Sequence, residues 1–196
     1  MAATRAERAH EVTSTPDLHL WHYSAQGILG WYKAMSGDPQ GLELLEESME
    51  RVTEATGQDR YQRPLLWYGD ACVALGEYAR AEDYLDQCLM VARERDSLYL
   101  PELTLQMVRV RHALGHAPQD VRRLAEQAYR VASEQENRHH QINACEVWLT
   151  LVDPDDDDMR QRFRQLLGQV SLTDAPMLVR WRLQLDRAFE PQHERS

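Results

Sequence analysis

The eight histidines are the residues of this sequence best suited to holding a metal ion. They include three close pairs: His19 and His22, His112 and His116, and His139 and His140. Gly115 interrupts the second pair, and adjacent residues such as the third pair point in different directions on a helix. No pair is followed by further ligands at a spacing that zinc sites use. The sequence therefore predicts no metal and no cofactor.

The sharpest run of charge is the acidic segment 153–158, which reads DPDDDD. It lacks the glycine and the distal glutamate of an EF-hand calcium loop. Acidic residues are favoured at the start of a helix, so we expect this segment to cap the helix that follows it. The three cysteines lie among apolar residues at helix-packing positions, outside any nucleophile motif. No set of residues fills the geometric roles of catalysis, and we expect a protein that is not an enzyme.

Composition limits the class of partner. The 196 residues carry 32 acids and 22 bases, a formal net charge of -10. Such a balance argues against a nucleic-acid or anionic-membrane partner, which would need a basic face. No stretch approaches the 18 apolar residues of a membrane span, and the first residues lack the apolar core of a signal peptide. The cysteines are few and their number is odd, which argues against a disulfide framework. Together these features favour a cytoplasmic protein.

The elements that position these residues are all expected to be helices. Apolar residues recur at helical spacing along the chain, and no segment alternates as a strand would, so the fold class is all-α. Asp38 and Pro39 are typical of a helix start, and Pro101 must lie in the first turn of its helix. The expected helices cover about residues 17–36, 39–56, 61–75, 77–95, 97–114, 118–131, 142–153, 155–167 and 174–189.

A fixed period organises these helices. Gly37, Gly76 and Gly115 lie 39 residues apart, and Gly30 and Gly69 keep the same interval seven residues upstream. A period of this size indicates one helical hairpin used repeatedly, as in a solenoid. We expect a flexible segment at 1–15, one repeat domain at 16–190 with about four hairpins of ~39 residues and a C-terminal capping helix, and a flexible end at 191–196. The fourth unit departs from the period, with proline at 154.

Residues 62–95 resemble a tetratricopeptide repeat. The matching positions are Leu65, Gly69, Gly76, Tyr78, Ala81, Leu85 and Cys88. From Trp21 onward the chain also resembles the C-terminal repeat region of large bacterial signalling ATPases and transcriptional activators. The stretches that carry this resemblance are GWYKAMSGDPQGLELLEESM, DACVALGEYARAEDYLDQCL and YLPELTLQMVRVRHALG. The resemblance implies a right-handed α-solenoid that serves protein contact and regulation, whereas the ATPase switch is not implied because the Gly-rich phosphate loop is absent.

In tetratricopeptide folds the first helix of each hairpin lines the concave surface, and this resemblance supplies the candidate site. Registering on Gly69 and stepping by 39 residues gives the partner-binding candidates Trp31, Met35, Arg63, Leu66, Asp70, Glu102, Arg109, His112, Gln141 and Trp148. A mixture of aromatic anchors and charges of both signs suits a peptide or protein segment. The alternative role for the two tryptophans is structural, in which their side chains fill the space between packed helices.

Two functions remain open from the sequence. One is a non-enzymatic interaction module that binds a partner protein segment in a concave groove, within bacterial regulation. The alternative is a ligand- or peptide-sensing domain of a signalling ATPase or transcriptional regulator. An enclosed pocket would favour the sensor, and an open groove the interaction module. The apolar stripe Leu178, Trp181, Leu185 and Phe189 would serve either as a cap or as a homodimer interface through a terminal helix.

Overall fold

The computed structural model describes residues 2–12, 19–56 and 62–169, and this part of the chain is helical without any β-strand. The prediction of an all-α fold is confirmed for these residues. The elements are α1 (Ala2–Val12), α2 (His19–Met35), α3 (Gln40–Thr56), α4 (Gln62–Leu75), α5 (Tyr78–Glu94), α6 (Leu100–Ala113), α7 (Pro118–Glu134), α8 (Arg138–Val147), the π-helical turn η2 (Trp148–Val152) and α9 (Asp157–Gly168). No helix among them is both long and apolar enough to cross a membrane.

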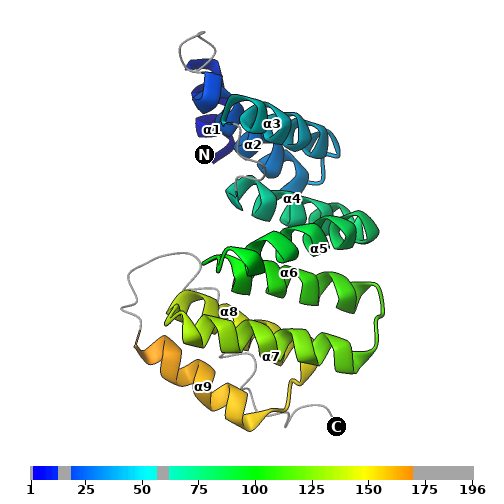
Figure 1. Ribbon diagram of the computed structural model, residues 1–196, viewed down its shortest axis with the longest axis vertical. Coiled ribbons are helices and arrows are strands. Elements are labelled where there is room, and N and C mark those ends of the chain that lie inside the picture. The colour runs from blue at the N-terminus through cyan, green and yellow to red at the C-terminus, as the bar shows by residue number, and fades with distance from the viewer. Residues whose placement is uncertain (1, 13–18, 57–61, 170–196) are drawn as a thin grey trace, which may run out of the picture.

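The helices are stacked along the long axis, with α1, α2 and α3 at one end, α4, α5 and α6 in the middle, and α7, α8 and α9 toward the other end (Figure 1). They pack as the pairs α2–α3, α4–α5, α6–α7 and α8–α9. The first helix of each pair also packs on the first helix of the next pair, which makes one row of α2, α4, α6 and α8. We call these the first-row helices, and α1, α3, α5, α7 and α9 the second-row helices.

Within the first three pairs the turn is made by a glycine in the left-handed region. Gly37, Gly76 and Gly115 have φ angles of 85°, 77° and 74°. The N–H of the following residue donates to the carbonyl five residues earlier, from Glu77 to Cys72 at 2.9 Å, for example. This is the Schellman ending of a helix, in which glycine avoids the steric cost of a Cβ. The predicted turn glycines are thus confirmed as turns.

The turns between pairs repeat this geometry without glycine. Asp96 follows α5 and Glu136 follows α7, and their φ angles are 48° and 53°. Ser97 and Asn137 donate the corresponding backbone hydrogen bonds to Ala92 and Ala132, at 2.9 and 3.0 Å. A non-glycine residue in this region carries a steric cost of about 1–2 kcal/mol. One turn geometry therefore connects successive helices throughout most of the chain.

The N-terminal segment differs from the sequence-based expectation. Residues 1–15 were expected to be flexible, but residues 2–12 form α1, which packs on α2. The imidazole rings of His10 and His22 stack with centroids 4.0 Å apart. Alanine and arginine, which dominate α1, are strong helix formers, and the contact with α2 adds the tertiary support that a short helix needs.

The buried core runs through all four pairs, and the cysteines belong to it as predicted. Cys72, Cys88 and Cys145 are buried and none forms a disulfide. Burial raises the pKa of the Cys72 thiol to about 11 and that of Cys145 to about 12. Thiols held protonated in this way are poor nucleophiles, so these side chains act as small apolar groups.

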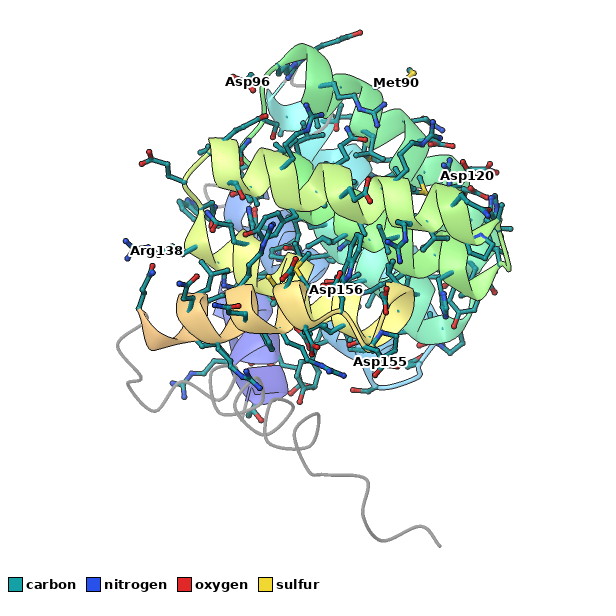
Figure 2. The ribbon with its side chains drawn as sticks, turned by 90° about the horizontal axis from the view of Figure 1, so that it is seen from below. Met90, Asp96, Asp120, Arg138, Asp155 and Asp156 are labelled. Carbon is teal, nitrogen blue, oxygen red and sulfur yellow. The ribbon has the colours of Figure 1, made fainter. Side chains whose placement is uncertain are left out.

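The fourth pair breaks the turn pattern. Helix α8 ends in the π-helical turn η2, where Asp153 donates its N–H to the Trp148 carbonyl at 2.9 Å. The chain then enters α9 through the acidic segment, whose Asp156 accepts from the Met159 N–H at 2.9 Å as an N-cap. Figure 2 shows Asp155 and Asp156 at the beginning of α9. The predicted capping role of this segment is confirmed. The expected terminal helix at 174–189 and the C-terminal end lie outside the described residues.

Candidate functional site

A line of polar side chains crosses the first-row helices. Trp31 lies on α2, Asp70 on α4 and Arg109 on α6, at steps of 39 residues, and they occupy the same position on three successive helices. Further contributions come from Glu102 and Gln106 on α6 and from His140 and Asn143 on α8. We call these seven residues the inner ladder. The helices position them because each first-row helix packs directly on the next.

Asp70 is the central acid of the inner ladder. Its Oδ1 accepts a hydrogen bond from Gln106 Nε2 at 2.8 Å. Burial raises the pKa of its carboxyl group to about 6, and repulsion from Glu102 adds to the rise. The guanidinium of Arg109 and the Gln106 amide oppose this effect. The carboxyl group of Asp70 thus has a pKa of about 6 and responds to any charge brought beside it.

Gln106 connects two consecutive first-row helices. Its side chain is 1% exposed, and its Nε2 also donates to the Leu66 carbonyl of α4 at 3.0 Å. Its Oε1 lies in the space that a side chain at Gly69 would occupy. That oxygen is buried and accepts no hydrogen bond from a described residue. Gly69 is therefore the residue that lets α6 approach α4 closely enough for this amide to reach Asp70.

Arg109 provides the guanidinium group of the inner ladder. Its side chain is partly exposed, and it makes no ion pair or hydrogen bond with any residue that the structure describes. It still acts on Asp70, whose pKa it lowers. A guanidinium presents a planar fork of donors that fits a carboxylate. Arg109 can therefore offer hydrogen bonds to an acidic group that reaches the ladder from outside.

Glu102 links α6 to α8. Its Oε2 lies 3.8 Å from His140 Nε2 and 3.4 Å from the Asn143 amide nitrogen. Burial lowers the pKa of His140, and His139 adds to this, although the Glu102 carboxylate opposes it. The imidazole is consequently held neutral near pH 7, where it can donate or accept a hydrogen bond. Among the described residues these Glu102 contacts are long, so its carboxylate can accept further hydrogen bonds.

The structure brings four of the ten predicted site residues into the inner ladder, namely Trp31, Asp70, Glu102 and Arg109. Leu66 is partly buried beside them, and its carbonyl anchors Gln106. Met35 is exposed near the C-terminal end of α2. The side chain of Arg63 lies outside the described residues. The remaining three, His112, Gln141 and Trp148, lie elsewhere.

Trp148 departs from its predicted place in a groove. It is 4% exposed, and its Nε1 donates to Asp156 Oδ2 at 3.0 Å. The Arg122 guanidinium lies over its ring, 4.9 Å from the centroid. The indole therefore packs between α7, η2 and α9, which was the structural alternative for it.

Two cavities lie at the edges of the first row. His112 lines one of about 520 Å³ between the α6–α7 turn and η2, together with His116, Arg122, Leu151 and Val152. Gln141 lines another of about 710 Å³, where α7 ends, α8 begins and α9 ends. Arg138, which borders this second cavity, lies at the start of α8 in Figure 2. Neither cavity includes a residue of the inner ladder.

The sequence-based reasoning missed three members of the inner ladder, which are Gln106, His140 and Asn143. All three are buried polar residues. The available signal was a polar side chain at a helix position that is otherwise apolar, which indicates a contact with a polar group on a neighbouring helix. Such a pattern cannot say which neighbour, because the contact depends on how the helices pack.

Among the described residues, no three His, Cys, Asp or Glu side chains come together as a metal site would require. The chain matches no known protein-family model, and its sequence matches no curated protein. The geometry of the inner ladder and the packing of the helices are therefore the features that indicate a function.

Proposed function

We propose that this protein is a non-enzymatic interaction module, a right-handed α-solenoid of tetratricopeptide-like hairpins whose first-row helices bind a segment of a partner protein. The proposal is supported by the 39-residue step, by the repeated turn geometry and by the row of packed first helices. A rigid stack presents its binding residues with little ordering cost. The proposed setting is bacterial regulation in the cytoplasm, with neither nucleic acid nor membrane as the direct partner.

The observation that carries the proposal is the arrangement of Trp31, Asp70 and Arg109 at one position on three consecutive helices. Arg109 has no ion-pair partner in the described part of the chain, and Asp70 lies between it and Trp31. Burying charges without partners is costly, so such groups are stable where they remain partly open to water or to a ligand. This arrangement offers an anion site beside an aromatic surface.

The chemistry of the ladder indicates what the partner segment contains. Arg109 would bind an acidic side chain or a C-terminal carboxylate through paired hydrogen bonds. Trp31 and the exposed Met35 would contact an apolar side chain that lies toward α2. Glu102 would bind a basic or amide group toward α8. The fitting ligand is thus an extended peptide with an apolar residue, an acidic residue and a basic residue in succession.

Selection from a random peptide library on the wild-type protein tests this function. We expect enriched peptides to carry an acidic residue next to an apolar one. Their dissociation constants should rise at least tenfold for the Trp31→Ala, Arg109→Ala double variant. Arg130→Ala is the matched control, because Arg130 lies on α7 and its side chain is 69% exposed. Loss of a well-packed aromatic or arginine anchor costs ~1–2 kcal/mol or more, which is about a tenfold change.

The outcome that contradicts the proposal is equal binding of every enriched peptide by the wild type and by a folded double variant. Circular dichroism and thermal unfolding would establish that the variant keeps its helices. A peptide that binds equally to the wild type, the double variant and the control then binds another surface of the protein. In that case the inner ladder does not have its proposed role.

A second candidate function is a ligand-sensing domain. One observation favours it, since the cavity of about 520 Å³ beside His112 has the volume of a typical small-molecule site. A bound ligand there would contact both α6 and η2 and change how the third and fourth pairs pack. Thermal shift screening of small molecules against wild type and His112→Ala separates the two functions. Stabilisation that depends on His112 supports the sensor.

A further inference from the structure

Helix α2 carries an apolar patch that no described residue covers. It consists of Leu20, Trp21 and Ile28, whose side chains are 42%, 67% and 41% exposed. Of the seven large hydrophobic side chains left exposed in the described part of the chain, four lie on α2. Trp21 and Ile28 are seven residues apart and so share one face of the helix. We call these three residues the α2 patch.

The residues equivalent to Ile28 in the later helix pairs show which helix this position contacts. Steps of 39 residues lead from Ile28 to Trp67, Gln106 and Cys145. Trp67 reaches α2, where its ring lies 3.8 Å from the place that a Cβ on Gly27 would take. Gln106 reaches α4 by its bond to the Leu66 carbonyl, and Cys145 is fully buried. In α4 and α6 this position therefore contacts the preceding first-row helix, and Ile28 has no such helix among the described residues.

Among the described residues, helix α1 also lacks one neighbour that α3, α5 and α7 have. The second-row helices α1, α3, α5 and α7 begin at Ala2, Gln40, Tyr78 and Pro118, at intervals of 38, 38 and 40 residues. Like α3 on α4 and α5 on α6, α1 packs on the first-row helix that follows it. Helices α3, α5 and α7 also pack on a first-row helix that precedes them. In the described part of the chain, α1 packs extensively only on α2.

We propose that the α2 patch and α1 receive an amphipathic helix of a partner protein, which adds to the stack as a further first-row helix. The row α2–α4–α6–α8 already contains three contacts of this kind, and the new helix would continue them by one step. Its apolar face would carry a glycine or alanine opposite Ile28. In the equivalent contact between α4 and α2, the ring of Trp67 packs against Gly27. This surface is separate from the inner ladder.

The probe for this site is a fluorescein-labelled peptide with the sequence of residues 19–36, which presents the Gly27 face that α2 itself offers to α4. Fluorescence anisotropy with the full chain should show saturable binding. Ile28→Asp is expected to weaken binding at least tenfold, and Trp21→Glu should have an effect in the same direction. A Gly27→Leu version of the peptide should likewise bind at least tenfold more weakly to the wild type.

Met90→Asp is the matched control, because Met90 is 61% exposed on α5 and its side chain points away from the stack (Figure 2). Its dissociation constant should lie within twofold of the wild-type value. Ile28 is partly exposed already, so we expect Ile28→Asp to keep the helical circular dichroism and the melting temperature of the wild type. Trp21→Glu provides the same test if Ile28→Asp unfolds.

Three results would overturn the proposal. The first is no binding of the probe to wild type, and the second is equal binding by the wild type and the folded Ile28→Asp variant. The third is a wild-type dimer in sedimentation that Ile28→Asp converts to monomer, which would assign the patch to a second copy of this chain. None of these results bears on Trp31 or Arg109, so the inner ladder is tested independently.

Discussion

Gln106 of α6 lies against the bare backbone of Gly69 on α4. Its Oε1 occupies the space of a side chain at residue 69, while its Nε2 donates to the Leu66 carbonyl and to Asp70. The glycine thus permits a polar bridge between two first-row helices. The close packing of α4 and α6 and the position of Asp70 both depend on this one missing Cβ.

Gly69→Ala should destabilise the protein although alanine is the better helix former. The new Cβ would meet Gln106 Oε1, and the amide could move only by breaking its two hydrogen bonds. Overpacking of this kind costs about 1–3 kcal/mol, against a gain of about 1 kcal/mol from helix propensity. Urea denaturation should show a net loss of about 1–2 kcal/mol in the free energy of unfolding.

Gly168→Ala controls for the addition of a methyl group without a clash, because Gly168 ends α9 and no atom lies within 4 Å of the Cβ that would be added there. Its free energy of unfolding should stay within about 0.5 kcal/mol of wild type. A double-mutant cycle of Gly69→Ala with Gln106→Ala should be strongly non-additive, since the second change removes the atom that clashes. Additive effects would show that the two residues do not interact.

Asp70 makes stability depend on pH in a definite direction. Its pKa is about 6 in the folded protein, against 3.8 for an unperturbed aspartate. Between about pH 4 and 6 the folded state holds a proton that the unfolded state has lost, so this carboxyl group lowers stability as the pH rises. Below this window both states are protonated, and above it both are ionised. The loss is then complete and constant at neutral pH.

Asp70→Asn should therefore raise the free energy of unfolding by about 1–3 kcal/mol at pH 7 and change it little near pH 4. The asparagine Oδ1 can still accept from Gln106 Nε2. Chemical denaturation at pH 4, 5, 6 and 7 measures the difference. Asp83→Asn, an exposed site on α5, is the matched control and should follow the wild-type pH profile. A constant difference between Asp70→Asn and wild type across this range would contradict the shifted pKa.

The two kinds of turn should respond in opposite ways to exchange with glycine. Glu136 has a φ of 53°, so Glu136→Gly should stabilise the protein by about 0.5–1 kcal/mol despite the entropy of glycine. Gly76 has a φ of 77°, so Gly76→Ala should destabilise it by about 1–2 kcal/mol. Thermal unfolding monitored at 222 nm compares both with wild type. The same sign of shift for both variants would refute the turn assignment.

Trp148 and Trp31 should differ sharply in their effect on stability. Trp148 is buried and donates to Asp156, so Trp148→Ala should cost about 3–5 kcal/mol and loosen α8 and α9. Trp31 is partly exposed, so Trp31→Ala should cost less, about 1–2 kcal/mol. Hydrogen exchange would show whether the loss of protection is confined to the fourth pair. Equal costs for the two variants would contradict the different burial of these indoles.

Much of the fold could be read from local signals. The turn glycines, Asp38 with Pro39, Pro118 and the acidic segment before α9 mark helix ends that the structure confirms within a few residues. Two elements were not predicted. Helix α1 is supported by its tertiary contact with α2, and η2 is a π-helical turn close to Pro154, where the fourth unit lacks the turn glycine.

Only part of the candidate site could be predicted from the sequence. The 39-residue step placed Trp31, Asp70 and Arg109 at one position because a repeat keeps the same face in every unit. It failed at Trp148, whose indole is buried and donates to Asp156 instead of lining a groove. It also gave no reason to notice Gln106, whose partners are 36 and 40 residues away.

The amino-acid sequence by itself determined most of the helices after α1, their order and the glycine turns, because helical periodicity, capping and left-handed glycines are properties of a few consecutive residues. Only the tertiary structure decided that Gln106 bonds to Asp70, that Arg109 stays unpaired among the described residues, and that Ile28 faces no preceding helix. These facts depend on the distance and rotation between helices, which the packing of side chains from distant segments sets.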